Sequence, residues 1–425
     1  MIDIGLLPWI VLGFVLGSIS GLTPGLHVNN FAALLLGASP ALLAAGIQPF
    51  HLASAILAAA ISQTFLDAIP AIFVGAPDAE TVLAVLPGHR LMMDGKGIEA
   101  VRLSALGSAG AVMVAALLIL PLSMIFGRYY QDLTGWIGPL LVLIATAMIY
   151  TENGPHIEGP GPMANFRYKA MAVLIFLTSG ALGAFSFSRE HLLYSPLDLA
   201  PQPLLPLLSG LFGASFLILS ISTHTEIPEQ RDLGFDLPAP ALARSIFMGG
   251  LAGSLVAWIP GISPAVATLV TRLGTDHDSS GREFLVSVAG VNTSCTIFSL
   301  VALLVIGRPR SGAAAAIGEL VEVSELMVWQ MVVMAAAVGA ASYLVTIRTA
   351  RLAATILHRL NYRLLCSAVL SGLILICAAF TGPFGLLIFT LSTLVGLAAP
   401  ICGVRKTHAM GVLMLPVIAY YMGWT

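Results

Sequence analysis

Polar side chains interrupt a chain that is otherwise apolar enough for a membrane. The first interruption is GLTPGLHVNN at residues 21–30, where Pro-Gly is followed by His27, Asn29 and Asn30. Each polar group costs free energy in lipid unless it has a hydrogen-bond partner or a ligand. Asparagine can donate and accept hydrogen bonds, and a protonated histidine attracts anions. These residues therefore predict a binding site for a small anionic molecule, although a histidine that only makes structural hydrogen bonds is the simpler alternative.

Two apolar stretches farther along the chain carry a second set of polar residues. AAISQTFLDAIP contains Gln63, Thr64 and Asp67, and GVNTSCTIFSL contains Asn292 and Thr293. An ionised carboxylate at the middle of a bilayer costs about 3 kcal/mol on insertion scales. Asp67 is therefore predicted to carry a proton or bind a sodium ion, with Gln63 and Thr64 beside it. Asn292 and Thr293 are predicted to bind substrate. The alternatives are hydrogen bonding between helices and a position of Asp67 near water.

Arginine offers a third chemistry, because its planar guanidinium group matches carboxylate and phosphate. Arg310 in GRPRSGAAAA is predicted to add positive charge to the substrate site, and an arginine that extends to the membrane interface is the alternative. The motifs HExxH, GxSxG and GxxxxGK[ST] are absent from the sequence. The sequence thus predicts no enzyme, no cofactor, no ATP-driven motor and no metal other than a sodium ion.

Composition fixes the class of protein that must position these residues. Of 425 residues, 58% are hydrophobic and 9% are charged, and the mean hydropathy is +0.95. A soluble domain carries roughly a quarter charged residues, so this chain cannot cover a water-facing surface. The net charge of −2 gives no indication of nucleic-acid binding. We expect an all-α, polytopic integral membrane protein of the cell membrane.

A series of apolar stretches is suited to crossing the bilayer, for which a helix needs about 20 residues. These stretches are 52–74, 101–126, 135–151, 168–186, 203–221, 284–306, 326–347, 364–380, 384–402 and 409–424. Two more apolar regions, 3–46 and 243–274, are broken by Pro-Gly. The expected total is about 10–12 membrane segments. The segment RTARLAATILHRLNYR at 348–363 has four arginines and no acid, and is predicted to be a cytoplasmic loop.

The two halves of the chain repeat a pattern. GFVLGSISGLTPGL at 13–26 matches GGLAGSLVAWIPGI at 249–262 with a constant offset of 236, and Gly75-Ala-Pro77 matches Gly307-Arg-Pro309 with an offset of 232. A polar stretch at 223–240 separates the halves. The predicted organisation is a first membrane repeat at 1–222, a polar linker at 223–242 and a second repeat at 243–425. The loop GRYYQDLTG after 101–126 corresponds to the arginine-rich loop, and counting spans places these two on opposite sides. The repeats are therefore predicted to be inverted.

The paired Pro-Gly breaks predict where a substrate binds. Proline removes a backbone donor and glycine permits unusual conformations, so together they end a helix. Backbone groups freed in this way must face protein or a water-filled cavity. A helix that restarts there directs its N–H groups and a partial positive charge at that cavity, which suits an anion. Each half would then form a broken or re-entrant helical hairpin. The predicted substrate-binding residues are Pro24, Gly25, His27, Asn29, Asn30, Pro260, Gly261, Ser263, Asn292, Thr293 and Arg310.

The quoted stretches resemble a known family. GLTPGLHVNNFAALLLG, WIPGISPAV and AGVNTSCTIFSLVALLVIGRPRSGAAAAI are similar to the large membrane subunit (TctA) of tripartite tricarboxylate transporters, especially its shorter archaeal branch. The resemblance spans most of the chain. It implies a secondary carrier of carboxylates such as citrate, built from two inverted repeats with Pro-Gly at the central breaks. It also implies a small membrane subunit and an extracytoplasmic binding protein as partners. Bacterial members usually have small residues after the first Pro-Gly, where this chain has His27 and two asparagines.

The sequence thus predicts a permease for a small organic anion, a di- or tricarboxylate, working by alternating access in symport with a proton or sodium ion. Two alternatives remain open. Polyprenyl-phosphate carriers also have inverted halves with Pro-Gly-x-Ser-Gly breaks, which PGIS at 260–263 matches up to Ser263. An intramembrane enzyme using His27 or Asp67 is the other. The expected partners are the lipid bilayer, the anionic substrate and the two accessory subunits, and the sequence leaves a homodimer open. The resemblance places the chain in a prokaryotic, archaeal-type membrane.

Overall fold

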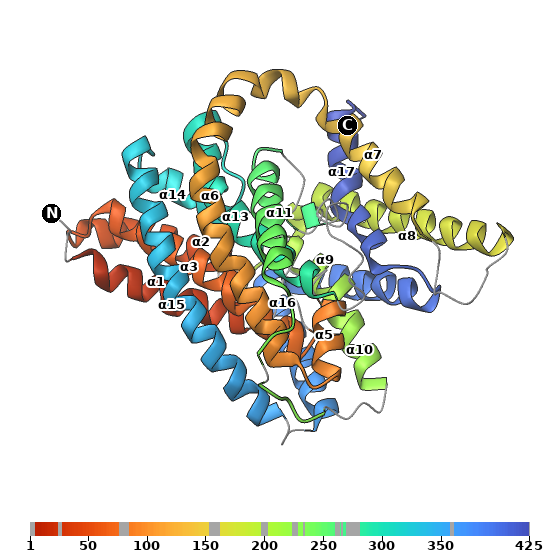
Figure 1. Cartoon of the computed structure of the whole chain (residues 1–425). Helices are drawn as coiled ribbons and strands as arrows, with labels where there is room; N and C mark the ends of the chain where they lie inside the picture. Colours follow the sequence, from red (N-terminus) through yellow and green to blue (C-terminus); the bar gives the residue numbers. More distant parts are fainter. Residues whose placement is uncertain are drawn as a thin grey trace. The chain divides into compact units, whose positions relative to one another are not determined.

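The computed structural model of the chain is helical throughout the part that it describes, with no strand there (Figure 1). The described residues are 5–23, 28–75, 85–152, 162–196, 203–222, 228–232, 234–259, 264, 267–268, 281–357 and 361–424. The expectation of an all-α, polytopic membrane protein is confirmed. The protein is a multi-pass protein of the cell membrane.

The helices follow one another in the order that the apolar stretches predict. The first half contains α1 (Leu6–Leu22), α2 (Val28–Ala44), α3 (Pro49–Leu66), α4 (Ala68–Phe73), α5 (Val85–Met93), α6 (Gly97–Thr134), α7 (Ile137–Tyr150), α8 (Pro162–Ser188), η2 (Glu190–Leu192), α9 (Leu204–Leu208), the π-helical η3 (Ser209–Ala214) and α10 (Ser215–Ser222). The second half contains α11 (Ala239–Val256), α13 (Arg282–Ile306), α14 (Gly312–Leu320), α15 (Glu325–Leu357), α16 (Tyr362–Ile401), η4 (Lys406–Met410) and α17 (Gly411–Tyr421).

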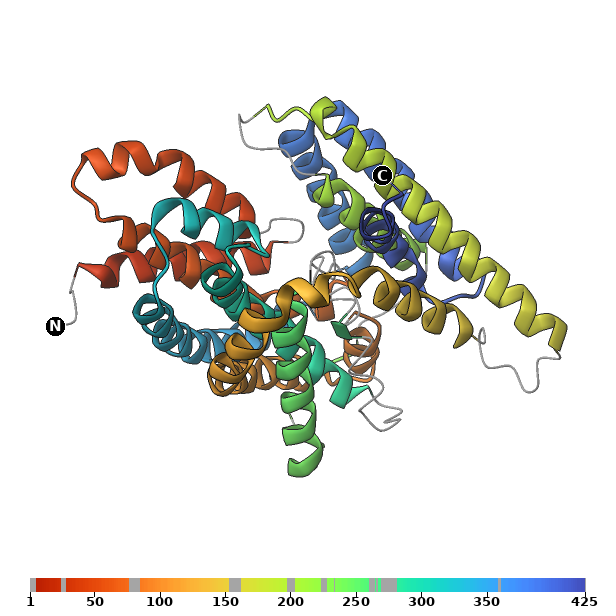
Figure 2. The same ribbon diagram turned by 90° about the horizontal axis from the view of Figure 1, so that it is seen from above.

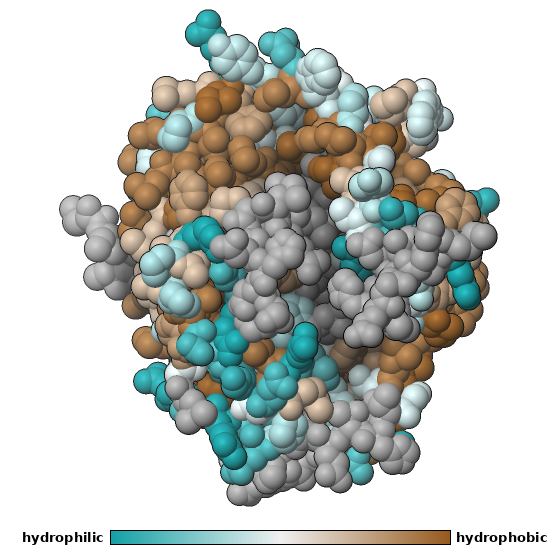
Figure 3. All heavy atoms as spheres, turned by 45° about the vertical axis from the view of Figure 1, so that its right-hand side comes forward, coloured by the Kyte–Doolittle hydropathy of each residue, from teal (hydrophilic) through white to brown (hydrophobic). Residues whose placement is uncertain are grey.

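Eight helices in the described part are long and apolar enough to cross a membrane. Shorter apolar helices lie at 6–22, 34–44 and 137–150. Figure 3 shows broad apolar areas in brown, while teal hydrophilic residues gather mainly in the lower half of the view, with others at its top and right edges. Exposed apolar side chains such as Leu117, Met124 and Leu143 are those of a surface that faces lipid rather than water. The predicted total of 10–12 segments stays a prediction.

The chain divides into two compact units, and each draws on both halves of the sequence. Unit 1 comprises 1–130, 225–258 and 264–365, and unit 2 comprises 131–224, 259–263 and 366–425. Unit 1 therefore holds the early helices of each half, and unit 2 holds the later ones. The division into a first repeat, a linker and a second repeat stays a prediction, because it concerns the order of segments in the sequence rather than their packing.

Within unit 1, the first helix of each half packs closely on a later helix of the same half. In Figure 2, α1, α2 and α3 lie side by side in red, and α11 packs on α13 in the same way as α1 on α3. Glycines make this approach possible, because a Cβ atom would collide with a backbone carbonyl of the partner helix. The four contacts are Gly13 on Ala55, Gly17 on Ala59, Gly249 on Ser287 and Gly253 on Val291. They keep the offsets of 236 and 232 found in the sequence.

A hydrogen bond from a serine hydroxyl to a backbone carbonyl also occurs at equivalent positions of both helix pairs. The Ser62 hydroxyl donates to the carbonyl of Phe14 at 3.2 Å, and the Ser294 hydroxyl donates to that of Gly250 at 2.7 Å. Phe14 and Gly250 are 236 positions apart, and Ser62 and Ser294 are 232 apart. The sequence repeat therefore corresponds to one contact geometry that occurs twice.

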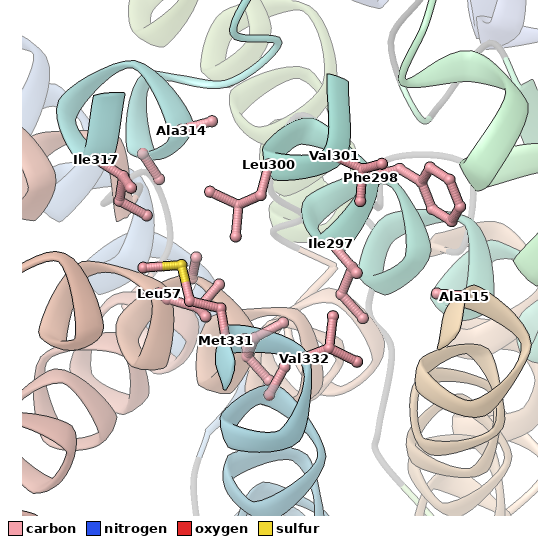
Figure 4. Packing of buried hydrophobic residues seen from close by; sticks show 14 of the residues in the cluster. Leu57, Ala115, Ile297, Phe298, Leu300, Val301, Ala314, Ile317, Met331 and Val332 are labelled. Carbon is pink, nitrogen blue, oxygen red and sulfur yellow. The ribbon is translucent and has the colours of Figure 1, made fainter. Parts of the chain in front are cut away.

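The long helices α6 and α15 each pack on a helix of the other half of the sequence. A Cβ on Gly107 of α6 would meet the backbone of Val286 in α13, whereas Gly339 of α15 lies beside the ring of Phe65 in α3. Gly107 and Gly339 are again 232 positions apart. The apolar core of unit 1 lies where these helices meet: Figure 4 shows Leu57, Leu300 and Met331 within one cluster. Each half therefore stabilises the other.

Two segments predicted to be loops are mostly helical. Helix α15 continues to Leu357, so most of the arginine-rich segment is helical. Helix α6 continues to Thr134 and includes most of GRYYQDLTG. Arginine and glutamine are good helix formers, so a helix that leaves the apolar layer does not have to end there. The predicted stretches 364–380 and 384–402 lie in one element, α16, which is interrupted at Gly382, where φ of 65° and ψ of −164° exclude other residues.

Unit 2 holds a group of ionisable residues before its last helix, of which Glu152 and His408 are buried. Glu152 accepts hydrogen bonds from the backbone N–H and Nε of Arg405 at 3.1 and 3.0 Å, and its Oε2 lies 2.8 Å from Nε2 of His408. Nearby in the sequence, Lys406 donates to the Ser215 hydroxyl at 2.9 Å. Burial lowers the pKa of Lys406 to about 8.

Replacing Gly253 by alanine tests the close approach of α11 and α13. The added methyl group meets the Val291 carbonyl, and we expect a loss of about 1–3 kcal/mol in stability, as is usual for overpacking. The matched control is Gly372→Ala in α16, because that glycine has no neighbouring atom within 4 Å of the new Cβ. Both changes favour a helix equally, so the control should keep or raise the melting temperature in detergent. Equal melting temperatures for the two variants would contradict the proposed packing.

The pH dependence of stability tests the environment of Lys406. Because its pKa is about 8 in the fold and near 10.5 when unfolded, the unfolded chain binds more protons between these values. The contribution of Lys406 to stability should therefore rise with pH from about 8 toward 10.5. In Lys406→Met this contribution should be absent, so the difference in melting temperature between wild type and variant should change across pH 7.5–10. A constant difference over that range would show that Lys406 is well solvated.

Candidate functional site

Helices α3 and α13 meet through polar side chains at the centre of unit 1. The Asn292 Nδ2 donates to Oδ2 of Asp67 at 3.0 Å, and the Thr293 hydroxyl donates to the Thr64 hydroxyl at 3.0 Å. Asp67 and Asn292 are 3% and 1% exposed, so these contacts are shielded from solvent. Thr64 and Asp67 share a helix face because they are three residues apart. The structure thus brings together residues predicted to couple an ion with residues predicted to bind substrate.

Ser108 of α6 completes this group, although it was not predicted from the sequence as a site residue. Its hydroxyl lies 3.3 Å from the carbonyl of Thr64 and 3.4 Å from that of Ala289. Helices α3, α6 and α13 therefore meet at one buried hydroxyl. A signal was present in the sequence: Gly107-Ser108 repeats the Gly-Ser pair found at 17–18 and 253–254.

The Asn292 side-chain oxygen is buried and has no hydrogen-bond partner in the described part of the chain. A buried acceptor without a donor is costly, so it marks a place where a ligand or a proton can add a bond. The oxygens of Asp67, Thr64, Thr293 and Asn292 are also the atom type that hard cations prefer. No group of three or more His, Cys, Asp or Glu residues suited to a metal ion occurs in the part of the chain that the structure describes.

The predicted polar residues Gln63 and Asn29 each bind the start of a helix. Oε1 of Gln63 accepts the backbone N–H of Val28, the first residue of α2, at 2.8 Å. Oδ1 of Asn29 accepts the N–H of Ala313, near the start of α14, at 3.1 Å. Side chains that accept helix N-terminal donors stabilise those ends. Gln63 therefore positions the helix that follows the first break, and Asn29 positions the start of α14, whatever else they bind.

Arg310 lies in a separate group, in the short segment between α13 and α14. Its Nη2 donates to the hydroxyl of Tyr130 at 2.8 Å and to the carbonyl of Trp258 at 2.7 Å. These hydrogen bonds join Arg310 to the end of α11 and to α6. Neither Tyr130 nor Trp258 was identified from the sequence, since a lone aromatic residue in an apolar stretch carries no distinctive signal.

The remaining predicted residues lie outside the described part of the chain. They are Pro24, Gly25, His27, Pro260, Gly261 and Ser263, together with the side chain of Asn30. The described helices end just before these positions, with α1 at Leu22 and α11 at Val256. Their role in substrate binding stays a prediction.

Comparison with known proteins identifies the family. The family model described as "Tripartite tricarboxylate transporter TctA family" matches residues 7–411. The chain belongs to this family. An uncharacterized protein of the archaeon Methanocaldococcus jannaschii is 25% identical over 427 aligned positions, covering 97% of this chain and 98% of that protein. No solved structure matches the chain.

Membership in the TctA family makes the chain a component of a tricarboxylate transporter. The predicted resemblance, including its archaeal character, is confirmed. Neither the family match nor the archaeal relative supports the polyprenyl-phosphate carrier or the intramembrane enzyme.

A double-mutant cycle tests whether the TctA-family chain uses the contact between Asp67 and Asn292. Asp67→Ala, Asn292→Ala and the double variant should give a coupling energy of about 1–2 kcal/mol in the free energy of unfolding. The control pairs Asn292→Ala with Ser371→Ala, an exposed position in α16, and should be additive within about 0.5 kcal/mol. Additive effects of Asp67→Ala and Asn292→Ala would mean that the two side chains do not interact.

Proposed function

We propose that the protein is a secondary transporter of a small organic anion, a di- or tricarboxylate, working by alternating access in symport with a proton or sodium ion. The observation that carries this proposal is the buried contact between Asp67 in the first half and Asn292 in the second. A carboxylate inside the membrane is costly, and intramembrane acids typically belong to proton or ion pathways.

The same contact suggests how an ion acts on the protein. Binding of a proton or sodium ion neutralises Asp67 and changes the hydrogen bond that Asn292 donates to it. Because this bond joins α3 to α13, the charge on Asp67 affects how the two halves are held together. A ligand shifts a conformational equilibrium only through such a difference in interactions between states. Gln63 and Thr64 lie beside Asp67 in the sequence and complete the proposed coupling site.

The anion is proposed to bind at the breaks that follow α1 and α11. Backbone N–H groups after Pro24-Gly25 and Pro260-Gly261 would hold it, as helix N-termini do for anions in general. Asn29, Asn30, Asn292, Thr293 and Ser263 would add hydrogen bonds, and His27 or Arg310 would add positive charge. Asn29 has a second role, because it also holds the start of α14.

The proposal includes partners. In a tripartite system the large membrane subunit works with a small membrane subunit and an extracytoplasmic binding protein, and we extend this arrangement to the present chain. A homodimer is compatible with the same mechanism, since the Asp67 and Asn292 contact lies within one chain.

Uptake of labelled citrate into proteoliposomes tests the coupling role of Asp67. Asp67→Asn keeps the size of the side chain and a hydrogen bond to Asn292, but the amide cannot carry a proton or neutralise a cation. We expect uptake driven by a proton or sodium gradient to fall by at least about tenfold, the effect of roughly 1.4 kcal/mol. Citrate should still raise the melting temperature, because ligand binding to the folded state stabilises it.

Asp94→Asn is the matched control, because Asp94 is an exposed residue in the turn after α5. This variant should transport normally. Full gradient-driven uptake by Asp67→Asn would remove Asp67 from the mechanism. Normal transport by both Asn30→Ala and Asn292→Ala would place the substrate site elsewhere.

A further inference from the structure

The guanidinium group of Arg310 has no acidic partner among the described residues. Its two hydrogen bonds go to neutral groups, the Tyr130 hydroxyl and the Trp258 carbonyl. Its Nε atom is buried and has no hydrogen-bond partner there. Arg310 as a whole is only partly buried, but its Nε is shielded from solvent, and a shielded cation is stabilised better by an opposite charge than by neutral dipoles. Arg310 therefore has an N–H group and a positive charge that the described residues leave unmatched.

The indole of Trp258 also has an unused hydrogen-bond donor, and the backbone carbonyl of the same residue accepts a hydrogen bond from Arg310. The side chain is completely buried, and its Nε1 atom has no acceptor among the described residues. Two aromatic rings fix its orientation: Phe126 stacks on it at 4.6 Å with an interplanar angle of 1°, and Phe298 meets it at 6.1 Å and 62°. Buried indole N–H groups usually find a partner. The stacked rings hold the indole in one orientation, so its unused N–H has a fixed direction.

The two unused donors belong to neighbouring groups from different segments. Trp258 follows the end of α11, and Arg310 lies between α13 and α14. The Arg310 guanidinium donates a hydrogen bond of 2.7 Å to the backbone carbonyl of Trp258. Tyr130 of α6 holds the guanidinium on another side. Every free group identified here is a donor, because neither indole nor guanidinium can accept a hydrogen bond. The pair therefore suits an anion and cannot bind a sodium ion.

We propose that Trp258 Nε1 and Arg310 Nε bind one carboxylate group of the transported anion. This inference rests on the proposed function and adds a residue, Trp258, together with a division of roles. Arg310 supplies the charge that the carboxylate neutralises, and the neutral indole donor sets the orientation of that carboxylate. Charge-assisted hydrogen bonds of this kind are short and strong, so losing one weakens binding measurably.

Replacing Trp258 by phenylalanine tests the inference. The change keeps an aromatic ring for stacking on Phe126 and removes only the N–H donor and part of the ring system. We expect the dissociation constant for citrate, measured by calorimetry on the purified full chain in detergent, to rise about tenfold. The ligand-free melting temperature is expected to fall modestly, because the cavity left by the smaller ring outweighs the relief of an unpaired N–H, so the citrate affinity decides the test. A purely structural role for Trp258 would leave the citrate affinity of the folded variant unchanged.

Arg310→Lys extends the test, because lysine keeps the charge but lacks an Nε–H in the guanidinium plane. Its citrate affinity should fall at least as much as that of Trp258→Phe. The matched control is Trp136→Phe, a tryptophan that is 72% exposed, and it should bind citrate as wild type does. Intrinsic fluorescence gives an independent readout, since a citrate-dependent change that arises from Trp258 should vanish in Trp258→Phe and persist in the control.

The outcomes separate this inference from the proposed function. If wild type binds citrate and Trp258→Phe binds it equally well, the inference is overturned and the transport proposal stands. If wild type binds inorganic phosphate but no di- or tricarboxylate, the carboxylate assignment and the proposed substrate are both wrong, even if Trp258→Phe weakens phosphate binding. If wild type binds none of these anions, both proposals are overturned.

Discussion

Helix α3 is buried along its apolar length, so the polar groups at its C-terminal end depend on partners from other helices. Gln63 accepts the first N–H of α2, Thr64 bonds to Thr293 and Asp67 accepts from Asn292. Rotating or sliding α3 would break these bonds where no water can replace them. The polar residues of one helix therefore fix the start of α2 and the register of α13, and the rest of unit 1 is arranged around them.

Close backbone approach is the second constraint, and it explains where glycine occurs. Helices in lipid gain little from the hydrophobic effect on one another, so they associate through tight packing of small residues and through hydrogen bonds. The glycines of α1 and α11 meet equivalent positions of α3 and α13, with the same serine-to-carbonyl bond in both pairs. Two copies of one structural element thus face each other across unit 1. Since α6 and α15 each pack on the opposite copy, a movement of one copy has to alter the other.

The membrane helices and the internal repeat could be predicted from the sequence. The length of the apolar stretches predicts the helices, and the spacing of glycine and proline predicts the repeat. Asp67, Asn292, Thr64 and Thr293 were predicted as site residues since polar groups are rare in such stretches, and the structure joins them. Their pairing could not be predicted, because it depends on how α3 and α13 meet in space. The contacts of Asn29 and Arg310 were also beyond the sequence. The partners of Arg310 are a carbonyl and a tyrosine hydroxyl, and neither leaves a pattern in the order of residues.

The proposed coupling follows from the charges of two side chains in unit 1. Asp67 and Arg310 carry opposite formal charges, so their sum is zero when both sites are empty. A monovalent cation at Asp67 alone, or one carboxylate group at Arg310 alone, changes that sum by one unit within the membrane protein, which is costly. Binding the cation and that one carboxylate group together restores the sum to zero. The proposed sites would therefore favour the empty and the doubly loaded states over either singly loaded state. That preference is a coupling free energy, and it requires no direct contact between substrate and ion.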